Sequence, residues 1–309
     1  MENYSETSTS TIDKTNKKTD DQVKAKRKPM NRKTKNRLEL ALMYTIIGIM
    51  FVIIFYPLFW AFAISMNTTA SLFGASLSPT TWSLDNYIWL FTNPRSNYLT
   101  WYGNTLFVSV IVSSVTTLLV SLTAYAFSRY RFKGRTYGLY AFLLLQMFPV
   151  LMAMVALFIL LNTIGLLDNL WGLILIYIGG GIPMNAFLVK GYFDTIPKSL
   201  DESAKMDGAG HFRIFFQILL PLAKPILSVV ALFNFMAPFM DFILPRIVLR
   251  SPENFTLALG LFNFVNAQFS NNFSRFAAGA VLIAIPIATV YLILQKYLIS
   301  GLASGATKG

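Results

Sequence analysis

Six long apolar runs dominate the sequence, and each is about as long as the roughly 20 residues that a helix needs to cross a bilayer. The runs cover residues 40–65, 104–127, 137–161, 171–189, 222–245 and 276–295. Only 13% of the residues are charged, against about 25% in an ordinary soluble domain. Such a chain cannot hide its apolar surface in one water-soluble core. The sequence therefore predicts an all-α membrane protein with six transmembrane helices.

The basic residues predict the orientation of these helices. Eleven of the 26 Lys and Arg lie within residues 1–37, and the second and fourth loops between the runs are also basic. The first loop has only Arg95 and the third has none. Because basic flanks stay in the cytosol, we expect both termini on the cytosolic side. The same distribution argues against a nucleic-acid partner, although the net charge is +12. The five tryptophans agree, since all fall at or near the predicted outer face: Trp60, Trp82, Trp89, Trp101 and Trp171.

The runs divide the chain into three parts. Residues 1–39 read as a disordered, basic cytosolic tail, with a docking arm for a partner or for anionic lipid as the alternative. Residues 40–298 are expected to form the membrane domain, and residues 299–309 a cytosolic C-terminal tail. The first run is too long for the core of a cleaved signal peptide, so we expect a retained helix.

Several kinds of chemistry lack the residues that they need. The chain has no Cys and a single His, His211, so neither a His-based metal site nor a Ser-His pair is expected. It also lacks the P-loop pattern of nucleotide-binding proteins. A membrane enzyme would need clustered acid, base or metal ligands. A self-contained secondary transporter, the other alternative, usually carries internal repeats or buried coupling charges.

The longest internal loop predicted to be cytosolic, residues 190–220, has a helical pattern. Ser199 and Glu202 match a capping box, in which two side chains satisfy free N–H groups at a helix start. Asp201 and Lys205 are spaced for an i, i+4 ion pair. A short amphipathic helix is therefore expected here.

Gly208 is expected to end that helix, because glycine readily adopts the positive φ of a helix C-terminus. A second helix is predicted over residues 211–220, with Pro221 and Pro225 marking its passage into the fifth run. By themselves these features fit two uses equally well: a loop lying on lipid headgroups or a docking element for a cytosolic partner.

The loop resembles the EAA loop of ATP-binding-cassette importer permeases. That family's pattern is E-A-A, three residues, Gly, nine residues, then I-x-L-P. The chain has Glu202-Ser203-Ala204, Gly208 and Ile218-Leu219-Leu220-Pro221 at this spacing. Ser203 in place of the middle alanine is the one departure, and Asp207-Gly208-Ala209 is also typical.

The resemblance implies the type I importer permease fold, with residues 197–221 as the coupling loop. In that family the short helix of the loop sits in a cleft of a separate ATPase subunit, which binds ATP and Mg. The chain itself is then a transport subunit without a cofactor, not an enzyme. The residues expected to form the coupling helix and its turn are Ser199, Glu202, Ser203, Ala204, Asp207, Gly208 and Ala209.

Two further stretches resemble the sugar-permease branch, and within it the maltose-type second permease. They are residues 82–87, Trp-Ser-Leu-Asp-Asn-Tyr, and the tail 301–309. In maltose-type transporters such a tail reaches the ATPase, so Lys308 and Gly309 are expected to contact it. The implied substrate is maltose or maltodextrin, with a galacto-oligosaccharide as the alternative.

The implied assembly lies in a bacterial cell membrane. It contains a second permease subunit, two copies of the ATPase and an extracytoplasmic sugar-binding protein, with lipid around the helices. The sugar is expected to cross between the two permeases, so this chain forms half of the pathway.

Asp241 is the only acidic residue within the six runs. An ionisable group inside a span defaults to a functional hypothesis, which makes it a candidate pathway residue. The alternative is an interfacial carboxylate paired with Arg246 or Arg250, because span ends tolerate charge.

The glycine-rich segment 179–183 is expected to break the fourth run, because Gly and Pro in a membrane helix can mark a discontinuity beside a cavity. Gly180 and Pro183 are therefore candidate pathway residues. Gln146, Asn185 and Asn234 could each offer a hydrogen bond to a sugar hydroxyl, or serve as helix–helix contacts.

Overall fold

The structure is a computed structural model that describes residues 32–68, 82–266 and 272–306. Within these ranges the regular secondary structure is helical, apart from an isolated bridge between Asn67 and Trp82. It divides into two units, Met1–Phe59 and Trp60–Gly309. The long helices are α2 (Arg32–Ser65), α4 (Tyr98–Arg129), α7 (Leu170–Thr195), α11 (Lys224–Met240) and α14 (Phe273–Ala306). The shorter helices are α3 (Asp85–Thr92), α5 (Arg135–Gln146), α6 (Val150–Thr163), α8 (Ser199–Met206), α9 (His211–Arg213), the π-helix η1 (Ile214–Leu219), α10 (Leu220–Leu222), α12 (Ile243–Val248), the 3₁₀ turn η2 (Pro252–Asn254) and α13 (Leu257–Phe262).

Among the described residues, four helices are long and apolar enough to cross a membrane, and the number rises to six if each of two bent pairs forms one span. The first bent pair, α5 with α6, turns through 97°. The second joins residues 211–222 to α11 through 80°. Six spans follow when each pair is counted once, in agreement with the six apolar runs.

The breaks in the helices do not fall where composition suggested. The third run is interrupted just before α6, where Pro149 has an extended ψ of 118°; a proline supplies no N–H and disfavours helix in the residue before it. The fourth run was expected to break at residues 179–183, and this expectation is wrong, since α7 continues through Pro183. Two helices also extend beyond the predicted apolar runs. The first run was predicted from residue 40, but α2 begins at Arg32, and the sixth was predicted to end at residue 295, but α14 reaches Ala306.

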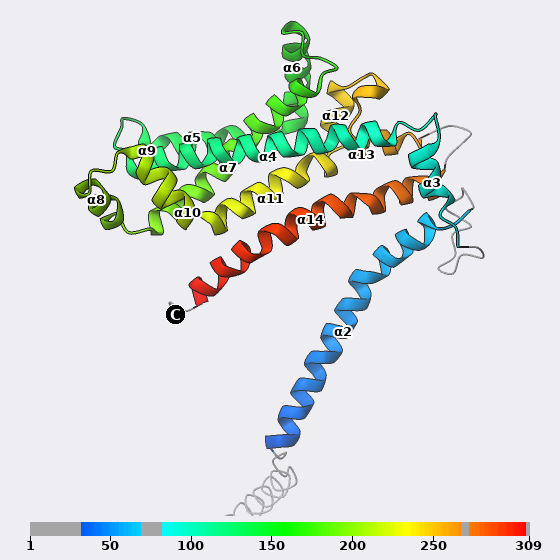
Figure 1. Cartoon of the computed structure of the whole chain (residues 1–309), viewed down its shortest axis with the longest axis horizontal. Coiled ribbons are helices and arrows are strands. Elements are labelled where there is room, and N and C mark those ends of the chain that lie inside the picture. Colours follow the sequence, from blue (N-terminus) through cyan, green and yellow to red (C-terminus); the bar gives the residue numbers. More distant parts are fainter. Residues whose placement is uncertain (1–31, 69–81, 267–271, 307–309) are drawn as a thin grey trace, which may run out of the picture. The chain divides into compact units, whose positions relative to one another are not determined.

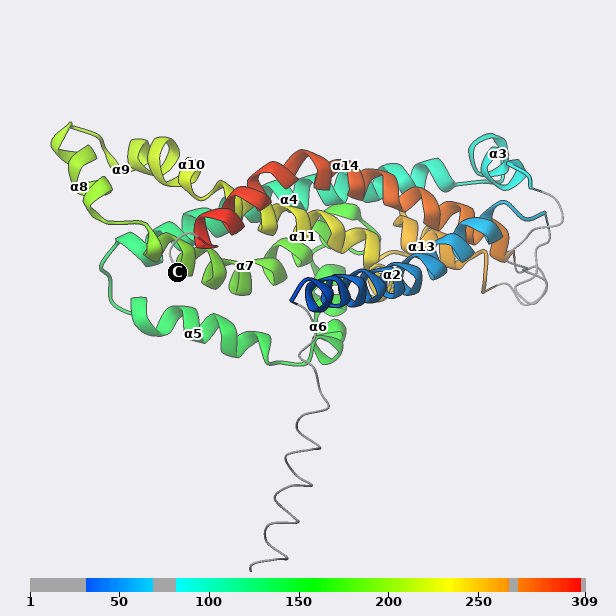
Figure 2. The ribbon, with the colours of Figure 1, turned by 90° about the horizontal axis from the view of Figure 1, so that it is seen from below.

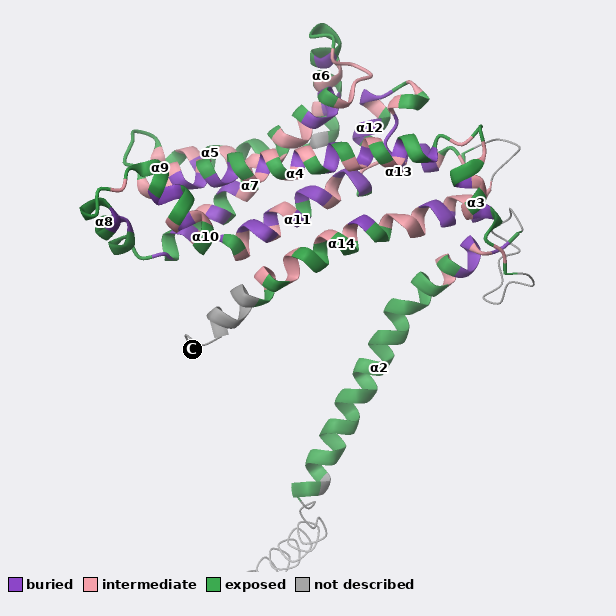
Figure 3. Cartoon of the chain, in the orientation of Figure 1, coloured by how far each residue is buried: buried purple, intermediate pink, exposed green. Residues whose placement is uncertain are grey.

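The second unit is built around α4. This helix packs along both α7 and α11, and α11 packs in turn against α14 (Figures 1 and 2). Buried side chains form two clusters, one toward α3 and α13 and the other toward α8 and η1. Figure 3 shows these buried positions along the facing sides of α4 and α11. Residues 197–221 therefore lie at one end of the bundle and α3 at the other.

The α3 end is closed by tight packing of aromatic side chains. Tyr98 is fully buried and donates to the carbonyl of Gly279 at 3.1 Å. The indole of Trp101 donates to the carbonyl of Pro252 at 2.8 Å and covers Gly260. A Cβ at Gly260 would lie 2.1 Å from that ring, so only glycine fits between α13 and α4.

The stretch 82–87, which resembles the sugar-permease branch, has a structural role at this end. The Asn86 side chain donates to the carbonyls of Ser65 and Asn67, at 3.0 and 2.8 Å. The Tyr87 hydroxyl shares a hydrogen bond with the Ser65 hydroxyl at 2.7 Å. Within the second unit, these contacts tie the last turn of α2 to α3.

Asp168, in the loop just before α7, binds the loop that contains residues 250–254. Its carboxylate accepts the backbone N–H groups of Arg250 and Ser251, at 2.9 and 3.1 Å, and the Ser251 hydroxyl. Its carbonyl accepts the side chain of Asn254 at 2.7 Å. Asp168 is also the only non-glycine residue in the described ranges with a positive φ, 56°, a conformation that Asp and Asn tolerate better than most residues.

Asp168 should make the stability of the protein sensitive to acid. Burial raises the pKa of its carboxyl, but the N–H groups of Arg250 and Ser251 and the Ser251 hydroxyl outweigh this and lower the pKa to about 2 from 3.8. A lowered pKa in the folded state stabilises the protein above the unfolded pKa, and this stabilisation is lost as the pH falls from about 4 toward about 2. We expect Asp168→Asn, which keeps the left-handed backbone, to lower stability by about 1 kcal/mol at pH 7.

Thermal unfolding of the purified protein in detergent at pH 7 and pH 3 checks this. The melting temperatures of the wild type and Asp168→Asn should differ at pH 7 and approach each other at pH 3. Glu253→Gln, at an exposed carboxylate in the same loop, should match the wild type at both. An Asp168→Asn protein as stable as the wild type at pH 7 would contradict this role.

Candidate functional site: the coupling loop

Gly208 ends α8 as the sequence predicts. Its φ is +76°, and its N–H bonds to the Lys205 carbonyl at 3.0 Å. The N–H of Ala209 reaches back to the carbonyl of Ala204 at 2.9 Å. This pair of bonds is the glycine-centred C-terminal motif that satisfies the last carbonyls of a helix. The turn therefore needs glycine for its backbone conformation.

The start of α8 differs from the prediction. The helix begins at Ser199, so Ser199 is its first residue and Lys198 takes the capping position without a side-chain hydrogen bond. The predicted capping box between Ser199 and Glu202 is absent. It requires the Ser side chain to stand just before the helix, and here the chain enters α8 one residue earlier.

Asp201 does not pair with Lys205, although the helical spacing suggested it. Its Oδ2 lies 2.6 Å from the Nε of Arg129, the last residue of α4. The two side chains are only 10% and 7% exposed. The contact has the distance of an ion pair but not the alignment of a hydrogen bond. A partner from another helix thus takes the place of the local one.

The same guanidinium also holds the end of α7. Its two terminal nitrogens donate to the carbonyls of Phe193 and Ile196, each at 3.1 Å. Carbonyls at a helix C-terminus have no partner within the helix, and an arginine can satisfy them. Arg129 therefore contacts three helices at once: α4, to which it belongs, α7 and α8.

α8 has one face inside the protein and one face outside. Asp201 and Ala204 are buried, whereas Ser199, Glu202, Ser203, Asp207 and Gly208 are exposed. Beside the exposed residues lie two large apolar side chains, Met206 and Phe212, which are 88% and 79% exposed. The sequence prediction missed these two, although their place on either side of Gly208 was a usable signal.

The second helix of the loop contains a π-helical segment. Residues 211–213 are α-helical, and η1 then carries the chain to α10. Ile214, Phe215 and Leu219 are buried against α4 and α7 side chains. A π-helix is uncommon and often lies at a functional site. The loop is thus anchored by apolar packing as well as by Arg129.

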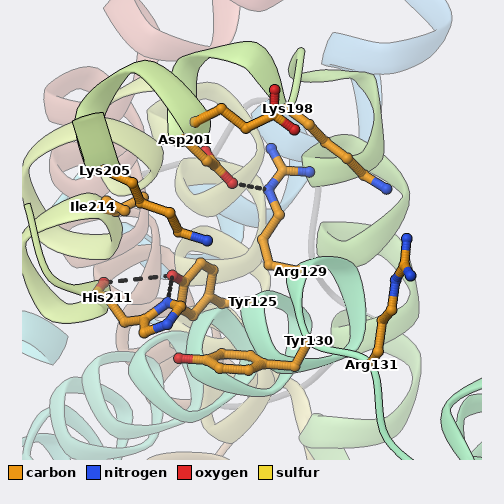
Figure 4. Close-up of a pocket in the computed structure, with 10 residues that line it drawn as sticks. Tyr125, Arg129, Tyr130, Arg131, Lys198, Asp201, Lys205, His211 and Ile214 are labelled. Atoms are coloured by element: carbon orange, nitrogen blue, oxygen red, sulfur yellow. Dashed lines mark hydrogen bonds and ion pairs between the residues drawn. The ribbon is translucent and has the colours of Figure 1, made fainter.

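A cavity of about 260 Å³ lies between α8 and the end of α4. Figure 4 shows the Arg129 guanidinium facing Asp201 on one side of it, and His211 beside Tyr125 on the other. The Tyr125 hydroxyl lies 3.4 Å from the His211 ring. In the described ranges no three His, Cys, Asp or Glu side chains gather as metal ligands.

Two of the candidate pathway residues meet at the glycine-rich segment of α7. The Gln146 side chain donates to the Gly180 carbonyl at 3.3 Å, and the Asn185 side chain donates to the Gly181 carbonyl at 2.7 Å. Pro183 lacks the N–H that would bond one turn back. The N–H that Pro183 lacks would have bonded the carbonyl of Gly179, whereas the two amides bond the next two carbonyls of α7.

Asn234 reaches the same segment from α11, and Asp241 contacts α7 at Tyr177. Asn234 is buried, donates to the Val230 carbonyl and places its oxygen beside Gly181. Asp241 accepts the Tyr177 hydroxyl at 3.0 Å and the N–H groups at the start of α12. It therefore bonds Tyr177 rather than Arg246 or Arg250.

The two residues expected to form the C-terminal contact, Lys308 and Gly309, lie outside the described residues.

The chain matches a known family of membrane proteins. The family described as "Binding-protein-dependent transport system inner membrane component" matches residues 117–304. The galactooligosaccharides transport system permease protein GanQ of Bacillus subtilis (strain 168) is 49% identical over 278 residues, which cover 90% of this chain and 98% of GanQ. The maltodextrin transport system permease protein MdxG of the same organism is 44% identical, covering 91% of this chain and 100% of MdxG.

The fold is also found among solved structures. A bacterial ABC transporter involved in the import of the acidic polysaccharide alginate contains a chain that superposes with a TM-score of 0.71. The match covers 88% of this chain and 99% of that one, at 24% sequence identity. At this identity the likeness concerns the fold.

Proposed function

Because the chain belongs to the family of binding-protein-dependent transport system inner membrane components, we propose that it is the permease subunit of an ATP-driven oligosaccharide importer. It is a transport subunit and not an enzyme. ATP and Mg are bound by a separate ATPase, a second permease completes the pathway, and a sugar-binding protein delivers the substrate. The observation that carries the proposal is α8: a short, exposed helix held to the bundle by one buried ion pair.

The outer surface of α8 suits a docking role. Met206 projects from a loop outside the candidate spans, and Phe212 projects from the first turn of the bent pair that is counted as one span. Exposed apolar side chains ringed by charged ones are typical of a protein interface. Here the ring includes Glu202, Lys205 and Asp207, all exposed. This arrangement favours a protein partner over lipid headgroups.

The proposal requires α8 to face the cytosol. The chain has no cysteine, so a single introduced cysteine reports on its own position. We expect a membrane-impermeant maleimide to label Arg95→Cys on intact cells and Lys205→Cys only after the membrane is opened. Labelling of Lys205→Cys from outside would reverse the topology and remove the ATPase contact.

Gly208 and Glu202 test the coupling role. In the purified complex we expect Gly208→Ala to lower ATP hydrolysis stimulated by the sugar-loaded receptor, because a Cβ at φ +76° costs roughly 1–2 kcal/mol and disturbs the turn. Glu202→Ala should lower the same rate by removing an exposed charge from the docking face. Both effects are measured as the rate of phosphate release with and without the sugar-binding protein in its sugar-bound form.

Gly210→Ala is the matched control. Gly210 has an ordinary φ of −74°, and the space that an alanine Cβ would occupy there is open, so its replacement should leave stimulation unchanged. Unaltered stimulation in both Gly208→Ala and Glu202→Ala would remove the coupling assignment from this loop.

The substrate we propose is a short oligosaccharide, with maltodextrin as the first candidate. The name of MdxG, and that of the maltodextrin transport system permease protein MalD of Streptococcus pneumoniae at 45% identity, both support it. The name of GanQ, at 49% identity, supports galactooligosaccharides as the second candidate.

The sugar-binding protein of the same transport system distinguishes the two. Titration calorimetry with maltose, maltodextrins of increasing length and galacto-oligosaccharides should give micromolar or tighter binding for one class. Uptake of that class into vesicles with this chain should then depend on ATP. Uptake without nucleotide would instead indicate a secondary transporter.

A further inference from the structure

We propose that Arg129 is a positioning residue that transmits the movement of α8 to α4 and α7 together, an inference that rests on the proposed function. Arg129 does not belong to the EAA pattern, and it lies 72 positions before Asp201 in the chain. The fold brings the two side chains into contact at 2.6 Å. A displacement of α8 therefore acts on the last residue of a spanning helix.

The connections of α8 show why this contact matters. In the described ranges, Asp201–Arg129 is the only side-chain ion pair or hydrogen bond between α8 and a spanning helix. The remaining links are the backbone on either side and the apolar contact of Ala204. Of the side-chain contacts only the ion pair fixes α8 to one particular residue, because apolar contacts are non-directional.

Arg129 distributes the displacement over two helices. Its planar guanidinium presents several donors in a fixed geometry. One nitrogen faces Asp201, while the other two hold Phe193 and Ile196 at the end of α7. Because α4 and α7 also pack along their lengths, they respond as one body when α8 moves.

A second route leaves α8 along the backbone. It runs through α9, η1 and α10 and reaches α11 across the 80° bend. This route reaches α11 and touches α4 and α7 only through the apolar side chains of η1, whereas Arg129 joins α8 itself to α4 and α7. The two routes diverge at Asp201 within α8, so a change at Arg129 should disturb one of them and leave the other intact.

Burial makes the ion pair specific as well as strong. The two side chains are about nine-tenths buried, where removal of one partner leaves an uncompensated charge. The second carboxylate oxygen, Oδ1, makes no hydrogen bond to another described residue. No neighbour in the described ranges therefore substitutes for Arg129 on Asp201.

The test measures coupling rather than activity alone. The complete transporter is reconstituted in vesicles, and sugar uptake and ATP hydrolysis are recorded on the same sample. We expect Asp201→Asn to retain ATPase binding and basal hydrolysis, while uptake per ATP falls roughly tenfold, within the usual range of coupling between sites. Arg129→Gln should behave alike, and Asp201→Glu should recover most of the wild-type ratio.

Lys190→Gln is the matched control. Lys190 and Asp194 form an ion pair of the same 2.6 Å length wholly within α7, close to the same end of the bundle. Its loss should leave uptake per ATP unchanged. An equal loss in Lys190→Gln and Asp201→Asn would mean that any charge lost at this end has the same effect, and would overturn the proposal.

A covalent link addresses the possibility that these variants misfold. Arg129→Cys/Asp201→Cys in this cysteine-free chain, with partner cysteines removed, can be bridged by a short reversible bis-thiosulfonate. We expect uncoupled vesicles before bridging, recovered uptake per ATP after it, and loss again on reduction. No recovery in a bridged complex that still binds ATPase would overturn the proposal.

The outcomes also separate this inference from the proposed function. If the wild type is coupled and Gly208→Ala uncouples it, but Asp201→Asn does not, then α8 couples through another contact and Arg129 is only structural. If the wild type shows no receptor-stimulated hydrolysis, the importer assignment itself fails.

Discussion

A hydrocarbon interior offers no hydrogen-bond partner to a backbone N–H or C=O, and the rest of this structure depends on that constraint. It makes every run helical and moves charged side chains toward the ends of the bundle. It also explains the side chains around the glycine-rich part of α7. Gln146 and Asn185 donate to carbonyls of this segment, and the helix continues where composition suggested a break.

The same constraint shapes the end of the bundle that carries the coupling loop. α7 ends with free carbonyls, and Arg129 supplies donors to two of them. The positive charge of the buried Arg129 guanidinium is compensated by the carboxylate of Asp201 in α8. The short helix is thus held by an interaction that also completes the end of a spanning helix, and its outer face remains free for a partner.

The opposite end of the bundle is held by close aromatic packing and by hydrogen bonds to a carboxylate. Tyr98 and Trp101 pack onto glycines of α14 and α13, where a side chain would not fit. Asp168 gathers N–H groups from a loop more than 80 residues away. Close packing and a hydrogen-bonded carboxylate hold this end, whereas α8 itself is held by one ion pair, the contact of Ala204 and a glycine turn.

The sequence alone determined the features that depend on local composition. Six apolar runs follow from hydropathy, and the end of α8 follows from Gly208, because only glycine adopts φ +76° at little cost. The tertiary structure decided the rest. Local spacing offered Asp201 to Lys205, but the fold supplied Arg129, and a buried pair between helices replaced an exposed pair within one. It also decided that α7 is continuous, that the loop contains a π-helix, and that α8 begins at Ser199. These depend on which side chains distant helices bring together, and no pattern of neighbouring residues contains that information.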